Sequence, residues 1–141
     1  NIYGQRTGPN PYSAVIDVFL EQARAGDPIT VHGSGEQTRD FVHVDDVVQA
    51  NLRAATTDAV GVAYNVGTGS SISIAELAEL IREVTDSDSP ITHEAERPGD
   101  ISESEADVSR ARERLGFEPT VDLRTGLARL ADATADPASP S

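Results

Sequence analysis

Only one segment of the chain, Val62–Val66, has the compact apolar pattern of a β-strand that is buried on both faces. Such a strand needs a hydrogen-bonded neighbour on each side, because unpaired backbone donors and acceptors are costly to bury. Around it, helical patterns alternate with short extended segments, which is typical of α/β organisation. The chain does not obviously supply the neighbours that this strand needs. The sequence therefore predicts an α/β fold with an incomplete sheet.

Helices are expected where apolar residues recur at helical spacing, and most of them begin at a capping side chain. The first helix spans roughly 12–25 and ends near Gly26. The expected caps of the later helices are Asp45, Ser73 with Glu76 as a capping box, Asp107 for a helix that stops at Gly116, and Asp122. The buried stripe predicted for the helix after Asp45 is Val44, Val47, Val48, Leu52 and Ala55. The other extended segments are Ile29–His32, Arg39–Val44 and Ile91–His93.

The chain is strongly acidic, with 24 acidic and 11 basic residues for a net charge of −13, and every basic residue is an arginine. An even spread of carboxylates without lysine suits hydration in concentrated salt, so we expect a halophilic, cytoplasmic protein. A GC-rich genome, which also favours Arg over Lys, is the alternative. Both interpretations disfavour nucleic acid as a partner, because its phosphates repel an acidic chain. Cysteine is absent and no apolar run approaches about 18 residues, so we expect neither disulfides nor a membrane span.

Two glycine-rich turns, Gly33-Ser34-Gly35 and Gly67-Thr68-Gly69, resemble fragments of a phosphate-binding loop. A dinucleotide fingerprint needs a third small residue three positions later, where this chain has Thr38 and Ile72. We therefore predict that both are structural turns. The three histidines lack metal-ligand spacing, and the acidic cluster within 100–107 is expected to be a solvated face, so no metal site is predicted.

Two arginines stand in unusual settings, because Arg39 lies inside an extended segment and Arg97 lies in the Arg97-Pro98-Gly99-Asp100 turn. Each could pair with a nearby carboxylate, Asp40 or Asp100, as isolated arginines often do. In concentrated salt, however, an acidic protein needs short bidentate arginine contacts to hold a dianionic ligand. Two such arginines suit a diphosphate.

The chain resembles the extended short-chain dehydrogenase/reductase family, in particular its UDP-glucose 4-epimerase-like and nucleotide-sugar dehydratase members. The matching segments are Asn1-Ile2-Tyr3-Gly4, 33–46 (Gly-Ser-Gly-Glu-Gln-Thr-Arg-Asp-Phe-Val-His-Val-Asp-Asp), Tyr64-Asn65-Val66-Gly67 and Arg97-Pro98-Gly99-Asp100. The resemblance covers about residues 1–130 and implies the C-terminal, substrate-binding part of such an enzyme, with an incomplete Rossmann sheet. Residues 1–133 would form this region, about 45–67 would complete an upstream Rossmann domain, and 134–141 would be a disordered tail.

The resemblance also implies a binding site for a nucleotide sugar, most simply a UDP-sugar. Arg39 and Arg97 match the family's diphosphate-binding arginines, and Asn1 would bind the substrate near its sugar and diphosphate. The positions that would border the nucleotide, its ribose or its base are Ser13, Ala14, Phe41, Asp100 and His32. His32 stands where relatives usually have Tyr or Phe.

Two features of such enzymes are absent from this sequence, namely a glycine-rich NAD turn and a Tyr-x-x-x-Lys acid/base pair. No catalytic residue is therefore assigned, and this chain alone is expected to be inactive. NAD would be bound mainly by residues outside the chain, in a missing N-terminal Rossmann half, and the parent enzyme would be a homodimer. Its reaction would be that of an isomerase or a lyase. The alternative is a non-catalytic nucleotide-sugar-binding module or a truncated remnant of such an enzyme.

Overall fold

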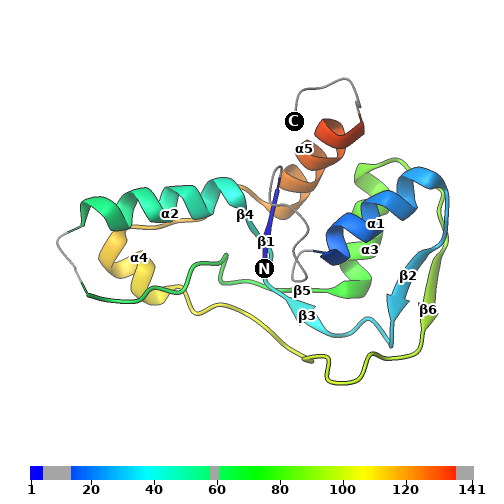
Figure 1. The fold of residues 1–141 in the computed structure, drawn as a ribbon, viewed down its shortest axis with the longest axis horizontal. Coiled ribbons are helices and arrows are strands. Elements are labelled where there is room, and N and C mark those ends of the chain that lie inside the picture. The colour runs from blue at the N-terminus through cyan, green and yellow to red at the C-terminus, as the bar shows by residue number, and fades with distance from the viewer. Residues whose placement is uncertain (5–13, 58–60, 136–141) are drawn as a thin grey trace.

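The computed structural model describes residues 1–4, 14–57 and 61–135 of the chain. Along these residues, helices alternate with short strands (Figure 1), which confirms the predicted α/β class. The helices are α1 (Ala14–Ala25), α2 (Val44–Thr56), α3 (Ile74–Val84), α4 (Ser109–Leu115) and α5 (Leu123–Ala135). The strands are β1 (Ile2–Tyr3), β2 (Ile29–His32), β3 (Thr38–Arg39), β4 (Val42–His43), β5 (Ile72–Ser73) and β6 (Ile91–Glu94).

The larger part of the molecule, which we call the body, has α1, α3 and α5 around one hydrophobic core (Figure 1). The helix predicted over 12–25 is confirmed for its described part, because its apolar residues face this core. Those residues, all buried, are Ile16, Phe19, Leu20 and Ala23. The chain leaves α1 at Gly26, whose φ of 74° lies in the left-handed region that ends many helices.

Strands β2 and β6 pair in parallel at the edge of the body, with His32 opposite Glu94 at their shared carboxyl end. Both strands were predicted from the sequence, and both are confirmed. Because the pair is parallel, the chain leaves both strands at the same end. His32 therefore lies beside the loop that follows β6 and carries Arg97.

The remaining strands form two further pairs, β1 with β4 in parallel and β3 with β5 antiparallel, and none of the three pairs joins another into one sheet. The strand predicted at Val62–Val66 is wrong: this segment has no regular secondary structure, and half-buried and exposed residues alternate along it. Within the described residues no strand lies beside it, so its backbone has no ladder to join.

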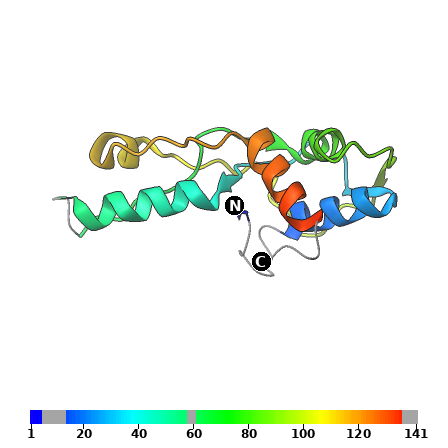
Figure 2. The ribbon, with the colours of Figure 1, turned by 90° about the horizontal axis from the view of Figure 1, so that it is seen from above.

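Helices α2 and α4 form a thin arm that extends from the body along the long axis of the molecule (Figures 1 and 2). They pack through a second, small hydrophobic cluster of Ala50, Ala111, Leu115 and Phe117. The predicted buried stripe of α2 is wrong at Val48, Leu52 and Ala55, which are all exposed, Val48 to 51% and Leu52 to 65%; Val44 and Val47 are half-buried. Their exposure follows from the packing, because α2 turns Ala50 toward α4 and no described residue covers the opposite face.

The helix caps agree only in part with the sequence-based expectations. Ser73 Oγ accepts a hydrogen bond from the Glu76 N–H, and Asp122 Oδ2 accepts one from the Thr125 N–H, as predicted. Asp45 is not the cap of α2: His43 holds that position, and its Nδ1 accepts a hydrogen bond from the Asp45 N–H. Asp45 lies instead in the first turn, where its charge still meets the positive end of the helix.

Three further boundaries differ from the expected ones. The N-cap residue of α4 is Val108, which makes no side-chain cap, and not the predicted Asp107. Asp107, one residue before Val108, accepts a hydrogen bond from the Ser109 N–H. The helix ends at Gly116, as predicted. The extended segment predicted at Arg39–Val44 is divided, because β3 and β4 are separate and α2 already begins at Val44. Of the tail predicted at 134–141, residues 134 and 135 belong to α5 and the rest lie outside the described residues.

None of the described helices combines the length and apolar character needed to cross a membrane.

Candidate functional site

Arg39 lies at the end of β3, where its guanidinium group is held by two acceptors. Nη2 donates to Asp100 Oδ1 over 2.6 Å, and Nη1 donates to the Thr38 carbonyl oxygen over 2.6 Å. The side chains of Arg39 and Asp100 are 14% and 29% exposed, so this ion pair is partly shielded from water. Of the two carboxylates considered from the sequence, Asp100 is therefore the partner of Arg39.

Arg97 contacts His32 across the open end of the β2–β6 pair. The predicted turn is present, because the Asp100 N–H donates to the Arg97 carbonyl oxygen over 3.3 Å. Arg97 Nη2 lies 3.1 Å from His32 Nε2, and His32 Nδ1 lies 3.3 Å from the Ala95 carbonyl oxygen. Since a guanidinium nitrogen only donates, Nε2 is the acceptor and the proton of a neutral imidazole is on Nδ1. His32 thus holds the Arg97 side chain at the edge of the body.

Gln37 joins these two arginine groups. Its Nε2 donates to the His32 carbonyl oxygen over 3.1 Å and to Asp100 Oδ2 over 3.4 Å. A single network therefore runs from Arg39 through Asp100 and Gln37 to His32 and Arg97, which we call the arginine network. Sequence reasoning missed Gln37, although it lies two positions from Arg39 in an extended segment and so is placed on the same side of the chain.

Asp40 is a buried carboxylate, 5% exposed, that binds backbone donors from two distant segments. Thr68 N–H donates to both of its oxygens over 3.0 and 3.1 Å, and Thr68 Oγ1 donates to Oδ1 over 2.6 Å. Gly69 N–H and Ala106 N–H donate to Oδ2 over 3.0 and 3.3 Å. The Gly67-Thr68-Gly69 turn thus directs its N–H groups at an internal anion, in agreement with its prediction as a structural turn.

The other predicted site residues that the structure describes do not belong to the arginine network. Phe41 is 4% exposed and belongs to the core of the body. The terminal amino group of Asn1 donates to the Asp40 carbonyl oxygen over 2.7 Å, which places residue 1 beside the segment that carries Arg39. Ser13 lies outside the described residues, and Ala14 opens α1. The roles expected for these four residues remain predictions.

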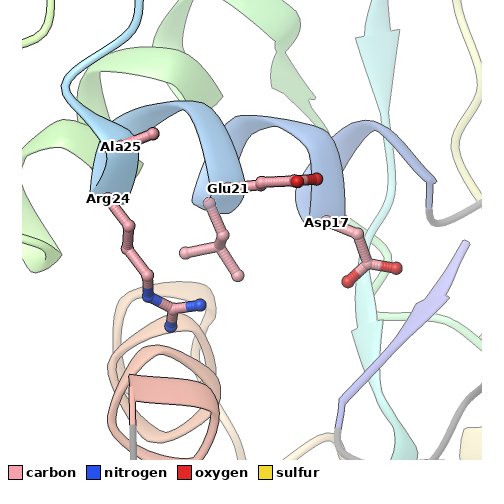
Figure 3. A pocket seen from close by; sticks show the side chains of 5 residues that line it. Asp17, Glu21, Arg24 and Ala25 are labelled. Carbon is pink, nitrogen blue, oxygen red and sulfur yellow. The ribbon is translucent and has the colours of Figure 1, made fainter.

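Figure 3 shows a hollow on α1. It is lined by Asp17, Leu20, Glu21, Arg24 and Ala25, and Arg24 Nη2 crosses to α5, where it donates to the Ala131 carbonyl oxygen over 2.6 Å. Burial raises the pKa of the Asp17 carboxyl. Since no residue of the arginine network lines this hollow, it adds nothing to the predicted site.

Among the described residues, no group of three or more His, Asp or Glu side chains is placed to hold a metal ion.

Comparison with known proteins shows which family this chain is similar to. Residues 1–67 match the sequence model of the NAD dependent epimerase/dehydratase family. The UDP-glucose 4-epimerase of Mycolicibacterium smegmatis is 41% identical over 130 residues, which cover 92% of this chain. The chain belongs to the NAD-dependent epimerase/dehydratase family. A second relative, UDP-glucuronic acid decarboxylase 1 of Arabidopsis thaliana, is 35% identical over 130 residues, which cover 92% of this chain. As predicted from the motifs, both relatives are named for UDP-sugars.

Solved structures of the family share the fold of this chain. The UDP-glucose 4-epimerase of Thermotoga maritima with UDP-glucose matches 96% of the chain with a TM-score of 0.88 and 36% identity. The UDP-glucuronic acid 4-epimerase of Bacillus cereus in complex with UDP-glucuronic acid and NAD matches 94% with a TM-score of 0.83 and 28% identity. The chain spans only about two fifths of these relatives, with 41% of the M. smegmatis protein and 43% of the T. maritima chain covered.

Proposed function

We propose that this chain binds the diphosphate of a nucleotide sugar, as the C-terminal part of an NAD-dependent epimerase or dehydratase similar to UDP-glucose 4-epimerase. The observation that carries the proposal is the arginine network, in which Arg39 and Arg97 are held in one hydrogen-bonded group by Gln37, His32 and Asp100. Relatives that match this chain are named for UDP-sugars, which supports the choice of a UDP-sugar as ligand.

The electrostatics favour a short-range anion site. The net charge of −13 repels a diphosphate at long range, so binding depends on direct contacts to guanidinium groups. Two arginines supply charge-assisted hydrogen bonds in forked geometry, which is the recognition that phosphates require. His32 Nε2 and Asp100 orient the arginines through contacts that a ligand can replace or share.

The Gly67-Thr68-Gly69 turn does not fit the pyrophosphate of NAD. The N–H groups of Thr68 and Gly69, which a dinucleotide would need, are already hydrogen-bonded to Asp40. The chain also has no lysine for a Tyr-x-x-x-Lys pair. We therefore assign no redox step to this chain, and the proposed role of its residues is to bind and orient the substrate.

The exposed apolar face of α2 indicates where the remainder of such an enzyme packs. Val48 and Leu52 are one helical turn apart, and each is more than half exposed. Segment 62–66, whose composition is that of a central strand, lacks a partner strand within the described residues. We propose that a Rossmann sheet formed mainly by the part of the relatives that this chain does not span covers both features.

The replacement Arg39→Ala tests the diphosphate site. We expect it to weaken the binding of UDP and of a UDP-sugar by roughly 2 to 4 kcal/mol, because a phosphate charge then loses its paired donor. Isothermal titration calorimetry at one fixed salt concentration measures the affinities, with pyrophosphate and UMP as partial ligands.

Arg112→Ala is the matched control. Arg112 also forms an ion pair, with Glu118 over 2.9 Å, but it lies on α4 in the arm and is half exposed. Its replacement is expected to leave the affinities unchanged. If Arg39→Ala binds UDP as well as the wild-type chain does, Arg39 is a structural residue and the assignment of the site is wrong.

A further inference from the structure

We propose that Asp40 is a positioning residue of the anion site: its buried carboxylate locks the three segments that together determine where the Arg39 guanidinium group points. The inference rests on the diphosphate-binding function proposed above. It assigns a role to a residue that touches neither the arginine side chains nor the expected ligand.

The backbone around Arg39 forms hydrogen bonds with a neighbouring segment on each side. On one side β3 pairs with β5, with Arg39 opposite Ile72. On the other side the Thr38 N–H donates to the Ser102 carbonyl oxygen over 2.9 Å, and the Ser104 N–H donates to the Thr38 carbonyl oxygen over 3.1 Å. The segment 38–40 therefore lies between β5 with the turn that precedes it, on one side, and segment 102–106, on the other.

Asp40 closes this arrangement one residue beyond Arg39. Its carboxylate accepts hydrogen bonds from Thr68 and Gly69, which precede β5, and from Ala106, at the end of segment 102–106. The same segment continues back to Asp100, the partner of Arg39. One side chain thus fixes both the strand that carries the arginine and the segment that carries its counter-ion.

The surroundings of Asp40 leave room only for a small side chain. A Cβ atom on Gly67 would lie 2.8 Å from Asp40 Oδ2 and 2.6 Å from Ala106 Cβ, so the backbone of the turn approaches the carboxylate as closely as a glycine allows. Among the described residues Asp40 forms no ion pair with an arginine or histidine side chain, so the N–H groups and the Thr68 hydroxyl stabilise its charge. An amide in place of the carboxylate would set an NH₂ group against one or more N–H donors.

The test compares Asp40→Asn with Asp46→Asn, a matched control in the same chain. Asp46 is 1% exposed and accepts hydrogen bonds from the Thr120 N–H and hydroxyl and from the Val121 N–H, but these contacts join α2 to the segment before α5. Both variants are expected to unfold at lower urea concentration than the wild-type chain. Affinities for pyrophosphate and UDP are measured by calorimetry under conditions where each variant is folded.

We expect Asp40→Asn to weaken pyrophosphate and UDP binding by roughly tenfold, as replacements that act on a site without touching its ligand can do, while Asp46→Asn leaves both affinities unchanged. In an Arg39→Ala background, Asp40→Asn should cause no further loss, because the effect passes through Arg39. The NMR signal of the Arg39 Nε–H group should shift in Asp40→Asn and stay in place in Asp46→Asn.

Three outcomes overturn the inference in different ways. If the wild-type chain binds UDP, Arg39→Ala weakens binding and Asp40→Asn does not, Asp40 is only structural and the proposed function stands. If Asp40→Asn and Asp46→Asn weaken binding equally, general loss of stability explains the result and the positioning role is refuted. If Arg39→Ala itself has no effect, the proposed function fails first and the positioning role fails with it.

Discussion

Asp100 competes with the anion that Arg39 is proposed to bind, so removal of its charge should tighten diphosphate binding. The carboxylate lies 2.6 Å from Arg39 Nη2 and is also held by Gln37. A phosphate oxygen that approaches the guanidinium group must share it with this carboxylate and is repelled by the same charge. Asp100→Asn preserves the shape of the side chain and removes the repulsion.

The geometry sets the size of the effect. Two unit charges about 4 Å apart interact by about 4 kcal/mol at an effective dielectric constant of about 20. The Asp100 side chain is 29% exposed, so water screens part of this interaction. We therefore expect a net gain of about 1 to 2 kcal/mol for pyrophosphate in Asp100→Asn, which corresponds to roughly 5- to 30-fold tighter binding.

Calorimetry with pyrophosphate and UDP on the same variant provides the measurement. UDP should gain less than pyrophosphate, because the family resemblance implies a ribose contact for Asp100, and loss of the carboxylate would remove it. The gain should vanish in an Arg39→Ala background. Equal or weaker pyrophosphate binding by Asp100→Asn would show that the carboxylate does not compete for Arg39, and the reasoning from the ion pair would be refuted.

Two further predictions concern the α5 helix. Gly126→Ala should lower the free energy of unfolding by about 1 to 3 kcal/mol in urea titrations, because the added Cβ atom would lie 1.9 Å from the buried Tyr3 hydroxyl oxygen; an unchanged or higher stability would contradict this packing. Hydrogen bonds from the Thr125 hydroxyl and N–H lower the pKa of Asp122, so the cap stabilises the fold above the unfolded value of about 3.9 and its contribution is lost as the pH falls through the lower folded value. Asp122→Asn should flatten the acid limb of the stability curve, and an identical limb in both proteins would exclude the cap as its source.

Local patterns predicted the elements whose contacts are close in sequence. The apolar spacing in 14–25 and the Ser73 cap concern residues within one or two helical turns, and both are present in the structure. Asp45 shows the limit of such reasoning, because the His43 side chain, two residues earlier, supplies the capping acceptor through its Nδ1 atom. Short polar residues are the preferred helix N-caps, so a prediction from these preferences chose Asp45 and missed His43.

The candidate site was predictable only as a set of charges. The sequence singled out Arg39, Arg97 and Asp100, and the structure joins them. It could not show which carboxylate Arg39 uses, because Asp40 is one residue away while Asp100 is 61 residues away. The adjacent carboxylate points elsewhere, to donors 28 and 66 residues distant, and long-range contacts of this kind leave no local spacing to detect.

Disagreement between sequence pattern and burial is itself informative in this chain. An amphipathic pattern reflects the contacts of each residue in the protein in which it functions, whereas the structure shows only the contacts that this chain provides. The pattern holds in α1 and α3, whose predicted apolar stripes are buried or half-buried in the body; Val18 of α1, which is 45% exposed, lies outside the predicted stripe. It fails at Val48, Leu52 and segment 62–66, all of them in or beside the arm, so the failures gather on one side of the molecule (Figure 1). Failures unrelated to a common surface would be scattered over both parts, so this concentration supports the interface proposed above between the arm and a Rossmann sheet.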